Sequence, residues 1–235
     1  MLGISTSTPR GSAALVQGER VLGRAAYEDE HGHAERIFGL LDELFAASGI
    51  ARAEVAALCC DVGPGSFTGV RAGLAAAKGI ALGAGLPLIG VGGLEAMAAA
   101  GFAALAPDSP LLRLACAVDA KRGEIFLAIY DRAGAVLAPP SCVRRDAVAD
   151  VLCELLGAAD VGLVGGTLEA CGLGEERRIR GHGCDLPDAV WVARCGAARL
   201  ARGELVPLGE IEPIYVRPPD ATPAPARAVA AGARR

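Results

Sequence analysis

The alternation of apolar and polar positions predicts short strands and longer helices in the first half of the chain. Three short apolar runs near the start predict strands, and a Gly18-Glu19 turn joins the last two as a hairpin. Apolar residues at helical spacing then predict a helix that ends before Gly49. A continuous apolar run, typical of a strand buried on both faces, precedes a glycine-rich loop. The predicted ranges are strands 2–5, 12–17 and 21–26, helix 33–47, strand 55–62, loop 63–69, helix 68–83, strand 88–91 and helix 94–105.

The segment from Ala106 to Pro110 interrupts this pattern and predicts a domain boundary, because it combines prolines with polar residues. Both halves open with a strand, a polar turn, an Arg-Gly pair and another strand, which suggests two related lobes at 1–106 and 111–216. After Arg217 the chain is rich in proline and alanine, so we expect residues 217–235 to be disordered. The elements predicted for the second half are strands 112–118 and 125–130, helix 145–156, strand 161–164 and helix 188–202.

Composition narrows the class of protein. Hydrophobic residues make up 52% of the 235 residues and aromatic residues only 4%, so few rings are available to stack on single-stranded bases. The formal net charge of −4 becomes −7 once the arginine-rich segment 217–235 is set aside. A body that acidic is a poor binder of a phosphate backbone by itself.

Cysteine usage and hydropathy predict a cytoplasmic protein without membrane contact. None of the eight cysteines forms a Cys-x-x-Cys pair, and most lie in apolar runs, so we expect buried, reduced thiols. The N-terminus lacks the charged and apolar regions of a signal peptide. Pro87 and several glycines interrupt the longest uncharged stretch, which lies between Lys78 and Glu95.

The segment from Asp61 to Leu74 joins a buried strand to a helix through several glycines. Backbone N–H groups at such a turn can face an anion, which makes Gly65, Ser66 and Thr68 candidate anion contacts. The spacing matches neither the lysine-bearing phosphate loop nor the dinucleotide fingerprint. The alternative is a structural turn in which Ser66 or Thr68 caps the helix, and the motif alone favours this alternative.

The helix after this loop contains several glycines and alanines close to one face. Each glycine inside a helix costs about 0.8–1.0 kcal/mol relative to alanine, so close approach of another backbone is expected to offset the cost. That backbone belongs either to the chain's own sheet or to a partner, and two small or apolar faces favour a second, intermolecular contact. The candidate contact residues are Gly69, Ala72, Gly73, Ala76 and Ile80.

Ionisable residues form no catalytic constellation that spacing can support. His33 opens the first helix, but a metal pair needs a second histidine four residues on, where the chain has Ile37. Asp119 follows a buried strand, where a carboxylate can hold a magnesium water in a nucleotide cleft, whereas Ser5 holds the equivalent place in the first half. No Ser-His-Asp or Cys-His arrangement is recognisable, and no metal site is predicted.

Six segments together resemble the bacterial TsaB family, over nearly the whole chain to Arg217. The glycine-rich segment is the most specific of them. The resemblance implies the actin-like, sugar-kinase-like ATPase fold, related to ribonuclease H, with two lobes of mixed α/β sheet flanked by helices. The segments are Gly63-Pro-Gly-Ser-Phe-Thr-Gly-Val-Arg-Ala-Gly-Leu, Lys78-Gly-Ile-Ala-Leu-Gly, Pro87-Leu-Ile-Gly-Val, His33-x-x-Arg36-Ile37, the stretch from Val118 to Phe126, and Glu212-Pro-Ile-Tyr-Val-Arg.

The resemblance also implies a function. TsaB proteins support the related catalytic subunit TsaD in forming N6-threonylcarbamoyladenosine at position 37 of tRNAs that read ANN codons. They bind TsaD through helices of the N-terminal lobe, which here carry His33, Arg36 and Ile37 and the small-residue face. TsaE joins the complex, and tRNA is bound through it. The expected chain is a non-catalytic accessory subunit with no cofactor of its own; ATP or ADP belongs to the complex, and a homodimer is the alternative assembly.

Two other functions compete with this one. The first is a small ATPase or kinase of the same fold that uses Asp119 and the loop at 63–69. It is weakened by Ser5, because most family members carry aspartate there within an Ile-Asp-Thr motif. The second is a peptidase, suggested by the relatedness of TsaD to proteins once called glycoproteases, but no metal or nucleophile motif supports it.

Overall fold

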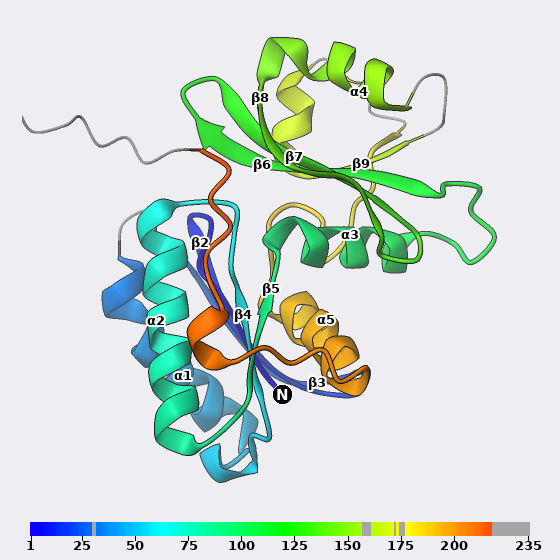
Figure 1. The fold of residues 1–235 in the computed structure, drawn as a ribbon. Coiled ribbons are helices and arrows are strands. Elements are labelled where there is room, and N and C mark those ends of the chain that lie inside the picture. Colours follow the sequence, from blue (N-terminus) through cyan, green and yellow to red (C-terminus); the bar gives the residue numbers. More distant parts are fainter. Residues whose placement is uncertain (30–31, 157–160, 172, 174–176, 218–235) are drawn as a thin grey trace, which may run out of the picture.

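The structure is a computed structural model, and it describes residues 1–29, 32–156, 161–171, 173 and 177–217. The chain forms two lobes, each built on one mixed sheet (Figure 1). The first sheet has strand order β3-β2-β1-β4-β5, and the second has order β8-β7-β6-β9. The strands are β1 (Leu2–Ser5), β2 (Arg10–Gln17), β3 (Arg20–Glu28), β4 (Leu58–Asp61), β5 (Leu88–Val91), β6 (Arg113–Lys121), β7 (Glu124–Asp131), β8 (Val136–Arg144) and β9 (Gly162–Val164). The α-helices are α1 (His33–Ser48), α2 (Phe67–Ala84), α3 (Gly93–Ala104), α4 (Val148–Leu156) and α5 (Ala189–Ala201).

Both sheets repeat one arrangement around a central strand. In the first sheet, β1 pairs antiparallel with β2 and parallel with β4. In the second, β6 pairs antiparallel with β7 and parallel with β9. The related topology of the two halves, predicted from their shared opening pattern, is therefore present in the structure.

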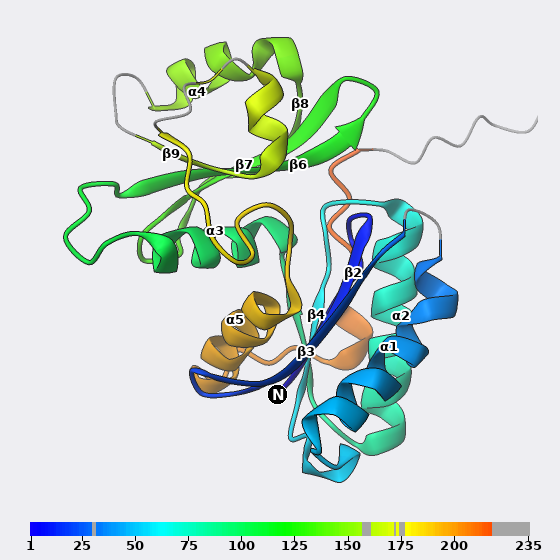
Figure 2. The ribbon, with the colours of Figure 1, turned by 180° about the vertical axis from the view of Figure 1, so that it is seen from behind.

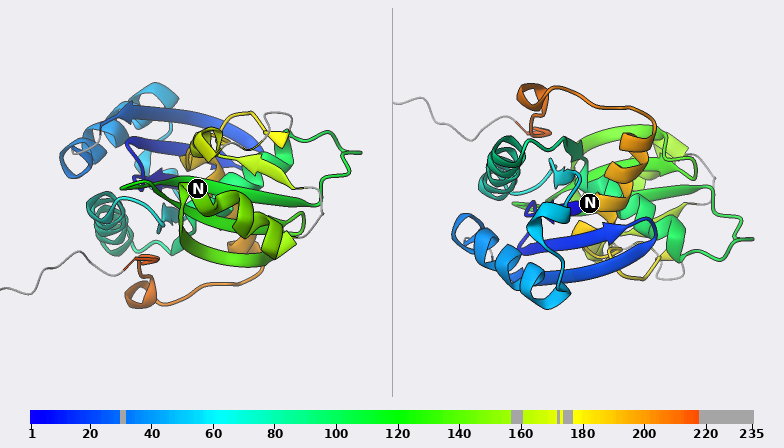
Figure 3. Two further views of the ribbon diagram at one scale, coloured as in Figure 1. Left: turned by 90° about the horizontal axis from the view of Figure 1, so that it is seen from above. Right: turned by 90° about the horizontal axis from the view of Figure 1, so that it is seen from below.

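Helices cover both faces of the first sheet. Leu2 and Ile4 of β1 pack into a core with the apolar sides of α1 and α2. On the opposite face, Cys59 and Ile89 pack with Val192 of α5. Figures 1 and 2 show the sheet between these two helical layers, and Figure 3 shows α1 and α2 side by side at one edge of the lobe. Two helices of the first lobe are thus placed at the molecular surface next to each other.

The predicted lobe ranges, 1–106 and 111–216, follow the two sheets but not the helices. Helix α3 precedes the predicted boundary, yet Leu94 and Met97 lie in the core of the second sheet. Helix α5 belongs to the second half of the chain, yet it covers the first sheet. Each helix buries its apolar side on the sheet of the other half, so the two lobes exchange helices across their junction.

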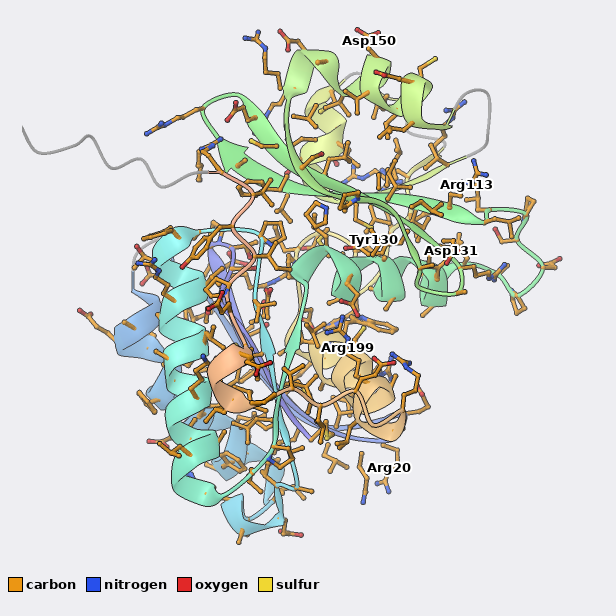
Figure 4. The ribbon with its side chains drawn as sticks, in the orientation of Figure 1. Arg20, Arg113, Tyr130, Asp131, Asp150 and Arg199 are labelled. Atoms are coloured by element: carbon orange, nitrogen blue, oxygen red, sulfur yellow. The ribbon has the colours of Figure 1, made fainter. Side chains whose placement is uncertain are left out.

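Side chains between α3 and α5 join the lobes. Arg199, labelled on α5 in Figure 4, donates one hydrogen bond to the backbone oxygen of Gly90 at 2.6 Å and another to Glu95 at 2.6 Å. Tyr130 of β7, also labelled, is buried in the core that α3 covers. Arg199 of α5 therefore links β5 of the first sheet to α3, the helix that covers the second sheet.

Most predicted elements are present, with three differences. Strand β8 is not predicted by the sequence because its interior holds Pro139 and Pro140, which are tolerated in an edge strand of the second sheet. The helix predicted from residue 145 begins with a 3-10 turn, Arg145–Ala147, before α4. Strand β4 is shorter than predicted at its N-terminal end. The tail predicted to be disordered lies, after Arg217, outside the described residues.

The eight cysteines are all free, as predicted, and four of them are buried. Burial raises the pKa of the Cys59 thiol to about 12 and that of Cys184 to about 11. Cys153 on α4 is the exception, since it is exposed. The buried thiols act as small apolar side chains of the core.

Candidate functional site

The glycine-rich loop is packed against the turn that follows β1. Ser66 caps α2, because its hydroxyl accepts a hydrogen bond from the N–H of Gly69 at 3.2 Å. This is the structural turn that the sequence analysis gave as the alternative to an anion contact. The N–H of Ser66 also donates to the backbone oxygen of Ser7 at 2.7 Å. A Cβ on Gly65 would lie 2.0 Å from that same oxygen. Glycine is needed here because the loop backbone touches the backbone of the chain itself.

Asp61 is the residue of this region that the sequence analysis did not single out. Its carboxylate is fully buried and accepts hydrogen bonds from the Ser5 hydroxyl at 2.7 Å, the Ser7 hydroxyl at 2.5 Å and the Gly63 N–H at 2.8 Å. Burial raises the pKa of Asp61, and the three hydrogen bonds oppose that shift. A lone carboxylate at the end of an apolar strand was the signal in the sequence. Asp61 thus places a carboxylate directly beside Ser5, which itself carries only a hydroxyl.

Two of the α1 residues that the sequence analysis singled out, His33 and Ile37, face inward. His33 is buried, and its Nδ1 lies 3.0 Å from the hydroxyl of Tyr27. Burial lowers the pKa of His33, so the neutral imidazole is favoured. Ile37 is 1% exposed in the core of the first lobe. Of the three residues predicted on this helix as partner contacts, only Arg36 is exposed.

The predicted small-residue face of α2 also packs inside the chain, which corrects its assignment as a docking face. A Cβ on Gly69 would lie 2.2 Å from the backbone oxygen of Thr6, and one on Gly73 would lie 2.1 Å from the Thr6 hydroxyl. Ala76 is buried in the same core as Ile37. Ala72 and Ile80 are half-buried at the border of this face. The close backbone approach that these glycines predicted exists, but its neighbour is the turn after β1.

The outward surfaces of α1 and α2 carry three further glycines that the chain does not cover. A Cβ added at Gly39, Gly79 or Gly83 would meet no atom within 4 Å beyond its own helix neighbours. Two large apolar side chains lie on the same helices: Phe38 is 55% exposed and Leu82 is 76% exposed. We call these five residues the outward surface of α1 and α2.

A groove of about 210 Å³ runs between the two helices at the end away from the second lobe. Phe38 of α1 and Ile80 and Ala84 of α2 line it, together with the buried side chains beneath. The ion pair of Asp42 and Arg52 lies at the same groove. Ile80, predicted as a partner contact, is therefore accessible from the groove.

A larger cleft of about 780 Å³ separates the lobes. The predicted anion contacts Gly65, Ser66 and Thr68 line its first-lobe wall, and Asp119 lines the opposite wall, so the structure brings these four residues to one cavity. The carboxylate of Asp119 is already engaged, since it accepts hydrogen bonds from Arg145 at 3.0 Å and from the N–H of Lys121 at 2.8 Å. Among the described residues, no group of three or more His, Cys, Asp or Glu side chains is placed to hold a metal ion.

Two lobes with related mixed sheets, joined across a cleft, define the actin-like ATPase fold. The model of the TsaD family, described as tRNA N6-adenosine threonylcarbamoyltransferase, matches residues 22–167. A protein of Haemophilus influenzae named tRNA threonylcarbamoyladenosine biosynthesis protein TsaB is 30% identical over 92% of this chain and 93% of its own. The chain belongs to the TsaB family.

Two further relatives support this membership. The Escherichia coli protein with the same name is 38% identical over 56% of this chain and 55% of its own. The structure of YeaZ from Pseudomonas aeruginosa is similar with a TM-score of 0.73 and 26% identity, covering 91% of this chain and 98% of that one. None of the described helices combines the length and the apolar character needed to cross a bilayer.

Proposed function

We propose that this chain is a non-catalytic accessory subunit in the formation of N6-threonylcarbamoyladenosine in tRNA, and that it docks on TsaD through the outward surface of α1 and α2. The observation that carries the docking site is the set of uncovered glycines on these helices. The family names support the pathway, since the relatives are called biosynthesis proteins of this modified nucleoside. The site of action would be the cytoplasm, with TsaE and tRNA joining through TsaD.

The uncovered glycines need a partner to account for them. Gly79 lies in the interior of α2, where glycine costs about 0.8–1.0 kcal/mol relative to alanine, and Gly83 lies in the last turn of the same helix. The inward glycines of the same helix are explained by contacts with Thr6, whereas the outward ones meet nothing in the chain. Glycines spaced four residues apart let a second helix approach closely, because no side chain stands between the two backbones.

The groove gives the same surface an apolar anchor site. Its volume of about 210 Å³ suits one or two bulky apolar side chains, and Phe38, which lines it, is 55% exposed. Interfaces derive most of their affinity from a few such anchors packed in pockets. We assign the anchors to a helix of TsaD, and a second copy of this chain on the same surface is the alternative outcome of the test.

Replacing Gly79 by arginine should separate docking from folding. The new side chain points to solvent in the isolated protein, and the loss of a helical glycine should raise stability by up to about 0.8 kcal/mol. In the complex the same side chain would be forced between two helices, so binding to TsaD should fall at least a hundredfold. Size-exclusion chromatography with purified TsaD and thermal unfolding of the isolated chain measure the two effects.

Ala198→Arg is the matched control, because it places the same side chain on an exposed position of α5. It should leave TsaD binding unchanged. If Gly79→Arg binds TsaD as tightly as the original chain, the docking surface lies elsewhere. If it binds TsaD but no longer self-associates, the surface serves a homodimer.

We further propose that the isolated chain does not hydrolyse ATP, and that ATP or ADP binds only in the complex. Asp119 is held by Arg145, and the carboxylate beside Ser5, that of Asp61, is fully buried and already accepts three hydrogen bonds from the chain, so neither is free to hold a magnesium water. An ATPase activity that releases phosphate faster than the buffer alone, copurifies with the chain and is lost in Asp119→Ala would contradict this proposal. The same assay with TsaD and TsaE present is the positive control.

A further inference from the structure

The last described segment of the chain is a strap, residues 208–217, that joins the cores of both lobes. Leu208 and Ile211 pack into the first-lobe core beside α2. The N–H of Ile214 then donates to the backbone oxygen of Val62 at 2.8 Å. Val216 packs against the second-lobe core. Figure 1 shows this strap, in orange to red, rising alongside α2 from the first lobe to the second.

The strap ends in an ion pair on the second lobe. Arg217 pairs with Glu124 at the start of β7 and also contacts the thiol of Cys142 on β8. Residues 213–217 form part of the lining of the interlobe cleft, next to the start of the loop that precedes α2. The position of the strap therefore depends on how the two lobes sit across the cleft.

A second contact fixes the strap to the first turn of α2. The Nε of Arg71 donates to the hydroxyl of Tyr215 at 2.7 Å. The guanidinium of Arg71 also lies 3.7 Å from the ring centroid of Phe67, and the rings of Phe67 and Tyr215 are 5.5 Å apart. These side chains remain partly exposed: Phe67 is 44% and Tyr215 is 49% accessible. This cluster, Phe67, Arg71 and Tyr215, is a clasp between α2 and the strap.

We propose that the clasp couples docking on α2 to the placement of the second lobe, with Arg71 and Tyr215 as positioning residues. This inference rests on the proposed docking of TsaD. Phe67, Arg71 and Leu82 lie on the exposed side of one helix, so a partner that covers α2 restricts the clasp. The clasp in turn holds the strap, whose far end is tied to Glu124. TsaD bound to the first lobe thereby stabilises one relative position of the two lobes across the cleft.

Thermodynamic linkage makes this coupling measurable from a distance. If docking of TsaD favours the arrangement in which the strap is held on both lobes, then that arrangement favours docking by the same factor. Glu124 lies on the second lobe, away from α1 and α2, and it anchors Arg217 there. Weakening that anchor should therefore lower the affinity for TsaD without touching the docking surface.

The experiment compares Glu124→Gln with the original full-length chain. Affinity for TsaD, measured by isothermal titration calorimetry, should fall about fivefold, the lower end of known coupling between sites. Amide hydrogen exchange at Ile214 should be slowed by TsaD and accelerated in Glu124→Gln. Arg71→Met should accelerate the same amide, and the double variant should lose less affinity than the product of the two single losses.

Glu204→Gln is the matched control, because it breaks the exposed pair with Arg202 and leaves the strap anchors intact. It should change neither readout. The proposal is overturned if Glu124→Gln binds TsaD with unchanged affinity. It is also overturned if neither Glu124→Gln nor Arg71→Met changes the rate of amide hydrogen exchange at Ile214. A chain that fails to bind TsaD at all contradicts the docking proposal, and the exchange measurements still decide whether α2 and the second lobe are coupled.

Discussion

Replacing Gly69 by alanine should destabilise the isolated protein by about 1–3 kcal/mol or more, the range for overpacking a well-packed site. The new Cβ would lie 2.2 Å from the backbone oxygen of Thr6, which belongs to the turn after β1 and has little room to move. The hydroxyl of the same Thr6 donates to the backbone oxygen of Gly69 at 2.8 Å, so relief of the clash also disturbs a buried hydrogen bond. Denaturant unfolding followed by circular dichroism measures the loss.

Gly79→Ala is the matched control on the same helix. Nothing lies within 4 Å of its added Cβ, so the variant should gain about 0.8–1.0 kcal/mol from helix propensity. The two substitutions have identical chemistry and opposite expected signs. If both destabilise, α2 is packed on two sides within the chain; if neither does, the loop does not lie against the turn after β1.

These two glycines also show what the sequence can and cannot predict about the site. The cost of glycine in a helix predicts that another backbone approaches α2, and one does at Gly69. The spacing of glycines along α2 does not say whether a given side contacts the chain itself or a partner, because both kinds of contact favour small residues. The pattern therefore groups Gly79 and Gly83 with Gly69 and Gly73 on one face, whereas the structure covers Gly69 and Gly73 with Thr6 and leaves Gly79 and Gly83 uncovered.

Periodicity predicts the local elements well and the packing between halves less well. The C-cap at Gly49 and the N-cap at Ser66 are confirmed, because both depend on the residue itself and its immediate neighbours. The exchange of α3 and α5 between lobes is not predictable from their apolar sides, since either sheet offers a suitable surface. Asp61 escapes prediction because its partners, Ser5 and Ser7, are more than 50 residues away in sequence.

Ser5→Asp should destabilise the protein at pH 7 by about 3–5 kcal/mol, the cost of a buried charge without a compensating partner. The Ser5 hydroxyl now donates to Asp61 at 2.7 Å, in a fully buried position. A second carboxylate at that distance removes a donor and adds a like charge. The substituted carboxylate would meet the carboxylate that β4 already supplies through Asp61.

The loss should depend on pH in a defined direction. Burial already holds the pKa of Asp61 above its ordinary value of 3.8, and a neighbouring carboxylate raises it further. A carboxyl whose pKa is raised on folding binds more protons in the folded state, so stability falls as pH rises from about 3.8 through the folded pKa. The unfolding free energies of Ser5→Asp should therefore approach those of the original chain below about pH 3.8 and diverge from them as the pH rises above that value.

The double variant Ser5→Asp with Asp61→Ser tests whether the carboxylate can move from β4 to β1. It exchanges the two side chains, so the junction again holds one carboxylate and one hydroxyl donor, while the Ser7 hydroxyl can turn toward position 5. We expect it to recover at least half of the stability lost in Ser5→Asp, a strong departure from additivity for residues in direct contact. A double variant as unstable as the sum of its parts would mean that the Gly63 N–H, which bonds to Asp61 at 2.8 Å, requires the carboxylate on β4.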